Sequence, residues 1–203
     1  MMRGLARRAS PRIRPPTAPG ATITVMPDEN NARPPSAYQL RTVPAYRLIT
    51  LRDQDNDAGV GARDAIERAG TTIVASTGYE LYISCAQDLL PVLVRVEIRE
   101  DYPAGENADA SSLRLTLECP SGRLVLGSPT GEAIGIDLTT GPGVYRVLVT
   151  HHGRLEAERR REQLLTRLAE NPGLDLRAAA EEHSGLERYT VALWRTGDLR
   201  DEA

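Results

Sequence analysis

Apolar and polar side chains alternate through most of the chain from Val43 onward, and this alternation predicts β-strands. The clearest runs are Val92–Arg99, Leu113–Cys119 and Val144–Thr150. Neighbouring side chains on a strand point to opposite faces, so Val94 and Val96 share an apolar face while Arg95 and Glu97 share a solvated one. One apolar face per strand indicates two antiparallel sheets packed across a core, because strands of a buried parallel sheet are apolar on both faces.

Turn residues divide the pattern into a series of short strands with two helical interruptions. The predicted strands are Val43–Leu51, Thr71–Ser76, Tyr79–Cys85, Val92–Arg99, Leu113–Cys119, Arg123–Leu126, Ala133–Leu138, Val144–Thr150 and Arg188–Arg195. A short helix is predicted at Ala62–Ala69, where Gly70 supplies the stop, and a helical insertion at Leu155–Glu170 and Leu174–Glu182. The fold class is therefore mainly β: an antiparallel two-sheet β-sandwich with a short early helix and a helical insertion before the last strand.

A tyrosine just inside a strand gives a more local prediction. The segment from Leu138 to Tyr145 contains the turn Gly141-Pro-Gly143, and it resembles the corner in which a tyrosine hydroxyl bonds back to upstream backbone. We therefore expect Tyr145 on the core face and Arg146 on the opposite face.

Residues 1–41 differ in composition from the rest, with seven prolines and little apolar periodicity. Such a segment buries too little surface to offset its ordering entropy, so we expect a disordered Pro/Arg-rich tail there. Its five arginines before Asp28 would also suit a nucleic-acid or membrane tether, although a plain tail is the simpler interpretation. We expect the sandwich domain at residues 42–197 and a C-terminal tail at 198–203.

Composition narrows the classes of function. The net charge of −3 argues against a general nucleic-acid-binding domain. All 25 cationic residues are arginine, so the lysine of a phosphate-binding P-loop is missing. Two cysteines, Cys85 and Cys119, are too few for a disulfide framework, and no run is apolar enough to predict a membrane span or secretory signal. A cytoplasmic protein with free thiols, no membrane partner and no cofactor is expected.

The sharpest candidate for a binding site is the loop Asp53-Gln-Asp55-Asn-Asp57. Alternate aspartates in a tight loop present several oxygens to one calcium ion, and Asp64 falls at the twelfth position of an EF-hand-style loop. Ala58, however, replaces the glycine of that loop, and a strand rather than a helix is predicted before it. The alternative is a solvated loop without a metal.

Other polar residues give weaker signals. His151 and His152 are neighbours on a strand and point to opposite faces, so a strand end explains them better than a metal site. Cys85 and Cys119 fall on apolar faces. The solvated faces of the later strands carry the acids Glu97 and Glu118 and four arginines, which are Arg95, Arg99, Arg114 and Arg146. These charges suit cross-strand pairs or a recognition surface. Trp194 is expected in the core.

Two groups of segments together carry a resemblance to known proteins. They are Tyr79–Cys85 with Leu113–Gly122, and Gly143–Thr150 with Glu187–Trp194. These segments resemble actinobacterial β-sandwich proteins that end in a Tyr-x-x-x-Leu-Trp strand and, more distantly, the competence protein J type of nuclease inhibitor. The likeness covers about residues 75 to 195, and it implies a protein that binds and restrains another protein.

The expected function is therefore a non-enzymatic, cytoplasmic protein-binding module of inhibitor or immunity type, with a protein partner. A calcium- or small-ligand-binding sandwich with its site at the Asp53–Asp57 loop is the alternative.

Overall fold

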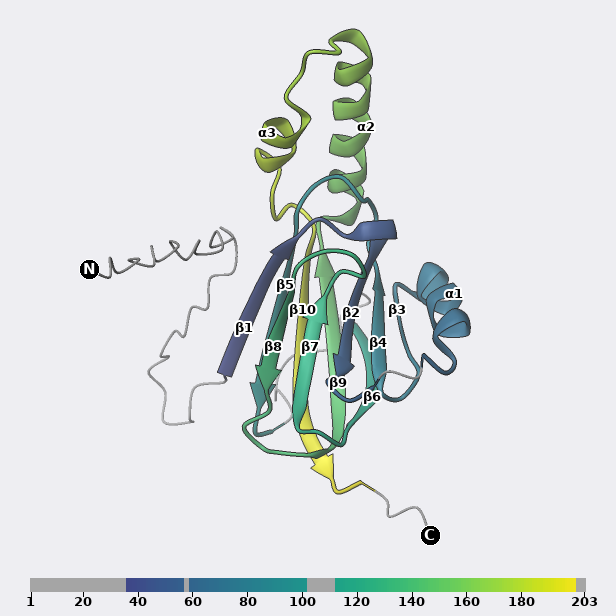
Figure 1. Ribbon diagram of the computed structural model, residues 1–203, viewed down its shortest axis with the longest axis vertical. Helices are drawn as coiled ribbons and strands as arrows, with labels where there is room; N and C mark the ends of the chain where they lie inside the picture. The colour runs from purple at the N-terminus through teal and green to yellow at the C-terminus, as the bar shows by residue number, and fades with distance from the viewer. Residues whose placement is uncertain (1–35, 57–58, 102–111, 200–203) are drawn as a thin grey trace, which may run out of the picture.

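Two five-stranded sheets face each other in the computed structural model, which describes residues 36–56, 59–101 and 112–199 (Figure 1). Sheet A contains, in spatial order, β1 (Ser36–Thr42), β5 (Val92–Arg99), β10 (Arg188–Gly197), β9 (Gly143–His152) and β6 (Ser112–Cys119). Sheet B contains β3 (Val74–Ser76), β4 (Glu80–Ser84), β2 (Leu48–Asp53), β7 (Arg123–Gly127) and β8 (Ala133–Asp137). The helices are η1 (Ala45–Arg47), α1 (Ala62–Thr72), α2 (Arg154–Glu170) and α3 (Leu176–Glu181).

The predicted two-sheet fold is confirmed, with its early helix and its helical insertion before the last strand. The predicted faces are confirmed as well: Val94 and Val96 are buried in the core between the sheets, together with Val147 and Val149. Sheet B is antiparallel throughout, but sheet A is mixed, because β10 runs parallel to β5. This parallel pair still carries polar side chains on its outer face, so apolarity on both faces is not a requirement for parallel pairing here.

The tyrosine corner is confirmed. Tyr145 is fully buried, and its hydroxyl donates to the carbonyl oxygen of Gly141. The Tyr145 hydroxyl oxygen also lies 2.7 Å from Thr140 Oγ1. Burial raises the pKa of the Tyr145 hydroxyl, which keeps it protonated as a donor. The ring thus fills the core beneath the turn while the oxygen satisfies backbone.

The N-terminal boundary of the domain differs from the prediction. Strand β1 occupies Ser36–Thr42 and pairs antiparallel with β5, although residues 36–41 were predicted to belong to the tail. Tails are predicted at residues 1–41 and 198–203, and of these, residues 1–35 and 200–203 lie outside the described residues. The predicted strand at Val43–Leu51 begins only at Leu48, because η1 turns the chain first.

The early helix also ends later than predicted. Gly70 lies inside α1, which continues to Thr72, and Ile73 follows with a φ of 73°. A branched residue rarely takes this left-handed backbone, so the sequence favoured glycine as the stop.

Trp194 is buried, but outside the main core. It is 7% exposed and forms a small cluster with Leu148 and Ala192 on the outer face of sheet A. Leu148, which interrupts the alternation of β9, belongs to this outer cluster.

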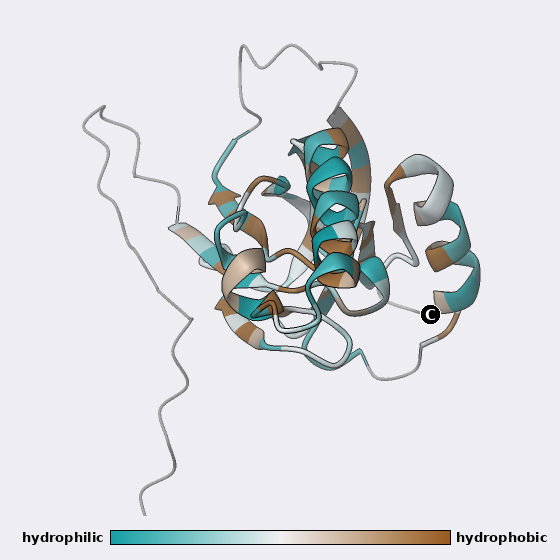
Figure 2. Cartoon of the chain, turned by 90° about the horizontal axis from the view of Figure 1, so that it is seen from above, coloured by the Kyte–Doolittle hydropathy of each residue, from teal (hydrophilic) through white to brown (hydrophobic). Residues whose placement is uncertain are grey.

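The helices α2 and α3 form a unit at one end of the sandwich (Figure 1). Ala157 and Leu164 of α2 pack with Ala179 and Ala180 of α3 and with Leu90. Most of the surface of α2 is hydrophilic (Figure 2). Among the described helices, none is both long and apolar enough to cross a bilayer.

Glycine at position 153 lets α2 begin directly after β9. Gly153 has a φ of 77°, and a Cβ placed on it would lie 1.8 Å from the carbonyl oxygen of Leu186. Only a residue without a side chain permits this close approach of the two segments.

Candidate partner-binding face

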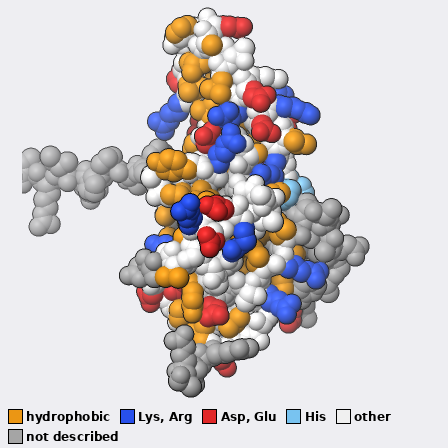
Figure 3. Space-filling model, turned by 90° about the vertical axis from the view of Figure 1, so that its right-hand side faces the viewer, with side chains coloured by type: hydrophobic (Ala, Val, Ile, Leu, Met, Phe, Trp, Pro, Cys, Tyr) orange, Lys and Arg blue, Asp and Glu red, His pale blue; other side chains and the backbone are white. Residues whose placement is uncertain are grey.

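The outer face of sheet B is only half covered. Helix α1 packs on its β3–β4 side, where Ala65 and Ala69 contact Ala75 and Tyr82. The outward side chains of β2, β7 and β8 lie beyond this helix. Figure 3 shows the side of the molecule on which α1 lies, where acidic, basic and apolar side chains are mixed. The half of this face formed by β2, β7 and β8 is therefore left uncovered by α1.

A groove of about 660 Å³ crosses this open half. Its lining from the strands includes Leu48, Thr50, Tyr82, Val125 and Ala133, and its lining from the flanking elements includes Tyr46, Ile66, Ser128 and Pro129. Most of these side chains are apolar. A groove of this size takes several side chains of a bound segment.

Tyr46 lies at the edge of the groove and is held in an unusual conformation. Its backbone has φ 57° and ψ 25°, and Arg47 follows with a φ of 60°. The N–H of Ala45 donates to Ser128 Oγ at 2.8 Å, which ties η1 to the turn between β7 and β8. Consequently the Tyr46 side chain projects from the surface and is 82% exposed.

The polar end of the groove is formed by Arg52 and Glu80. Tyr82, nearly buried between them and the apolar lining, donates its hydroxyl to Glu80 Oε2 at 2.6 Å. Burial, with the hydrogen bond and negative charge of Glu80, raises the pKa of the Tyr82 hydroxyl. The groove thus combines an apolar surface with one carboxylate at its end.

The fold of this chain is similar to that of known protein structures, although its sequence is not similar to that of any known family. No family model matches the chain, and no curated protein matches it. ComJ from Bacillus subtilis, an inhibitor of the DNA-degrading activity of NucA, superposes with a TM-score of 0.52 at 11% identity, over 80% of this chain and 98% of ComJ. The fold resembles that of ComJ. The crocagin biosynthetic gene J protein superposes with a TM-score of 0.46 at 18% identity, over 78% of this chain and 95% of its own.

The likeness to ComJ is one of fold, and it confirms the distant resemblance to the competence protein J type of nuclease inhibitor. At such low identity it assigns no residue of this chain a role. Any role of the groove on sheet B therefore depends on the side chains of this chain alone.

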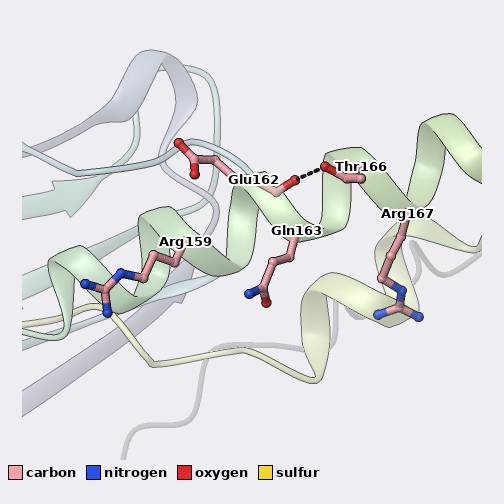
Figure 4. A pocket seen from close by; sticks show the side chains of 5 residues that line it. All are labelled: Arg159, Glu162, Gln163, Thr166 and Arg167. Carbon is pink, nitrogen blue, oxygen red and sulfur yellow. Dashed lines mark hydrogen bonds between the residues drawn. The ribbon is translucent and has the colours of Figure 1, made fainter.

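A second hollow, of about 550 Å³, lies along α2 (Figure 4). Its lining comes entirely from that helix and is polar or charged: Arg159, Glu162, Gln163, Thr166 and Arg167. Thr166 Oγ1 donates back to the carbonyl oxygen of Glu162 at 3.1 Å. Because one helix supplies every side chain, this is a surface depression rather than a site enclosed by several elements.

The aspartate loop is tied into the fold through Asp53. This residue is fully buried: its Oδ1 accepts from the N–H of Asp55 at 2.9 Å, and its Oδ2 accepts from Ser121 N and Oγ at 3.1 and 2.7 Å. Asp55 is exposed, and Asp64 is exposed in the first turn of α1. Asp57 lies outside the described residues. Within the described chain, no three His, Cys, Asp or Glu side chains gather as metal ligands.

Calcium binding at this loop stays a prediction open to test. Because both oxygens of Asp53 already accept hydrogen bonds, we expect excess calcium to leave the melting temperature unchanged, since only binding to the native state raises it. Thermal melts with and without calcium measure this. A saturable rise that disappears in Asp55→Ala would instead establish the calcium site.

The histidines and cysteines lie apart from the groove. His151 and His152 end β9, where they pair with Tyr189 and Arg188 of β10. Cys85 and Cys119 are free, buried thiols. Burial raises the pKa of both, that of Cys119 to about 12, so neither is a thiolate at neutral pH.

The charges on the outer face of β5 pair along that strand. Arg95 Nε and Arg99 Nη2 contact the two oxygens of Glu97 at 2.7 and 2.6 Å, all within β5, whereas the sequence predicted cross-strand pairs. Burial raises the pKa of Glu97, but the hydrogen bonds from Arg99 and Arg95 outweigh it and lower the pKa overall. One carboxylate thus accepts from two guanidinium groups of the same strand.

Sequence reasoning missed the groove because its residues come from four separate stretches of the chain, within 46–52, at 66, and within 80–82 and 125–133. The available signal was the presence of apolar side chains at outward positions of strands, at Leu48, Tyr82 and Val125. Single outward apolar residues are common on protein surfaces, so only the fold shows that these three meet.

Proposed function

We propose that this chain is a non-enzymatic protein-binding module that holds and restrains a protein partner through the outer face of sheet B. The fold likeness to ComJ, which inhibits the DNA-degrading activity of NucA, supports an inhibitor-like role. It makes a nuclease the first class of partner to test. The same chain in an immunity role would bind by the same face.

The observation that carries the proposal is the groove with Tyr46 at its edge. A left-handed backbone costs a non-glycine residue about 1–2 kcal/mol. The Tyr46 ring is 82% exposed, so its burial does not compensate for this cost in the free chain. Strained residues of this kind cluster at binding and switch sites. Tyrosine is also enriched among the residues that dominate binding energy at interfaces.

Tyr46→Gly separates binding from stability. Glycine takes the left-handed backbone without strain but adds freedom to the unfolded chain, so we expect the free energy of unfolding to change by less than about 1 kcal/mol. Loss of the anchor should weaken partner binding by about 2 kcal/mol, roughly 30-fold. Denaturant melts and titration against the partner recovered from native lysate measure the two quantities.

Leu155→Ala is the matched control, because Leu155 is 71% exposed on α2, away from the groove. This variant should bind the partner as the native chain does. If Tyr46→Gly binds unchanged while Leu155→Ala does not, the docking face lies on the helical insertion and the proposal is wrong.

A further inference from the structure

Arg52 and Glu80 stand directly opposite each other on β2 and β4, yet they do not pair. Both belong to the outer face of sheet B, and both line the groove. Side chains of opposite charge at such positions ordinarily form a cross-strand ion pair. No ion pair within 4.0 Å joins the two side chains. Within the described chain, each of them is hydrogen-bonded to a different group instead.

Arg52 is occupied by the backbone of the following loop. Its Nη1 donates to the carbonyl oxygens of Asp53, Gln54 and Asn56 at 3.2, 3.2 and 3.1 Å. The guanidinium thereby stabilises the loop that follows β2. The side chain of Asp53 holds the same loop through its hydrogen bond with Ser121. Moving it to Glu80 would leave these carbonyls without their donor.

Glu80 is left with a single side-chain donor. Tyr82 Oη–H binds Oε2, and within the described chain Oε1 has neither a hydrogen bond nor a cation. While the groove is open, water solvates this oxygen. A partner that covers the groove removes that water, and an unpaired carboxylate then opposes binding. If the partner places a cation against this oxygen, the Glu80 carboxylate favours binding instead.

We propose that the groove takes a segment of the protein partner that lays apolar side chains on Leu48 and Val125 and sets an arginine or lysine against Glu80. This inference rests on the proposed function and specifies the chemistry of the partner. Glu80 then acts as a specificity-determining residue: it attracts a cationic segment and rejects an acidic or wholly apolar one, because both leave its carboxylate unpaired.

Three capped pentapeptides test the selection. Each has leucine at both ends and arginine, glutamine or glutamate in the centre, with threonine between. Each is titrated against the isotope-labelled full chain by NMR. The arginine peptide should shift the amides of Thr50, Tyr82 and Val125 and bind about fivefold more tightly than the glutamine peptide, as expected for a partly exposed ion pair. The glutamate peptide should bind most weakly.

Glu80→Gln should abolish the preference for arginine over glutamine. Glu118→Gln removes the same charge from the outer face of sheet A and should keep the preference, which excludes an effect of net charge.

Two results would overturn the inference in distinguishable ways. Equal affinities of the arginine and glutamine peptides for the native chain would remove the role of Glu80 and leave the groove as a docking site. If no peptide gives saturable shifts at the groove, the docking face of the proposed function falls together with the inference.

Discussion

Replacing Tyr145 with alanine is expected to lower the free energy of unfolding by about 3–5 kcal/mol. The ring is fully buried in the core between the sheets, so truncation leaves a large cavity. The hydroxyl also holds the turn before β9 through Gly141 and Thr140. Urea or guanidinium melts, followed by near-ultraviolet circular dichroism and fluorescence together, measure the loss.

Two variants at the same turn separate the contributions. Tyr145→Phe keeps the ring and removes the hydrogen bonds, so it should cost about 0.5–1.5 kcal/mol. Arg146→Ala alters the solvated face and should change stability by no more than about 0.5 kcal/mol. If Arg146→Ala proves more damaging than Tyr145→Ala, the assignment of strand faces is reversed.

Glu187→Ala is expected to destabilise the chain by about 3–5 kcal/mol, because it leaves several buried donors, together with Arg154, without their shared acceptor. Glu187 is 1% exposed, and it accepts from the N–H of Ala86 at 2.7 Å and from Gln87 Nε2 at 3.3 Å. The Tyr189 hydroxyl and Arg154 Nη1 also contact it. Burial, with the nearby Cys85 and Glu187, raises the pKa of Tyr189 and keeps it a donor.

Replacing both charged partners tests the physical cause. The double variant Glu187→Leu with Arg154→Met removes both charges, so it should be less destabilised than Glu187→Ala alone, even though more polar contacts are lost. Melts of the native chain and of these two variants at one pH give the comparison. If Glu187→Ala costs less than about 1 kcal/mol, water reaches the network and the buried pair is not a determinant of stability.

Much of the sandwich was predictable because strands β5 and β9 of sheet A largely follow a period of two. In β5 the even positions from Val92 to Ile98 are all buried, and in β9 Tyr145 to Val149 repeat the pattern. A shift of one residue in the pairing register would move all the apolar side chains of such a strand to the solvent face, so the alternation specifies strongly which face is buried. The exception, Leu148, is explained by the outer cluster with Trp194.

Strand β1 and the parallel pairing escaped prediction for different reasons. In β1 the only fully buried apolar side chain is Leu40, and prolines precede the strand, so its local pattern is weak. Whether β10 runs parallel or antiparallel to β5 depends on the path of the chain between them. The alternation of apolar and polar side chains in β10 is the same in either direction. Pairing partners distant in sequence are fixed by tertiary structure alone.

The candidate site was less predictable than the fold. The aspartates drew attention because their spacing fits a known ligand pattern, but Asp53 serves as a buried acceptor for Ser121. Arg52 and Glu80 lie 28 positions apart, and their failure to pair shows only when the loop carbonyls are in place. Binding surfaces assembled from several strands leave no local motif.

Hydrogen–deuterium exchange on the chain bound to its co-purified partner tests the docking face most directly. We predict slower exchange at Tyr46–Arg52, Glu80–Tyr82 and Gly127–Ala133 in the complex than in the free chain, because these segments form the groove. Exchange on α2 and on the outer face of sheet A should remain as in the free chain. Protection confined to α2 and α3, with the groove segments unchanged, would contradict the assignment of sheet B as the surface that holds the partner.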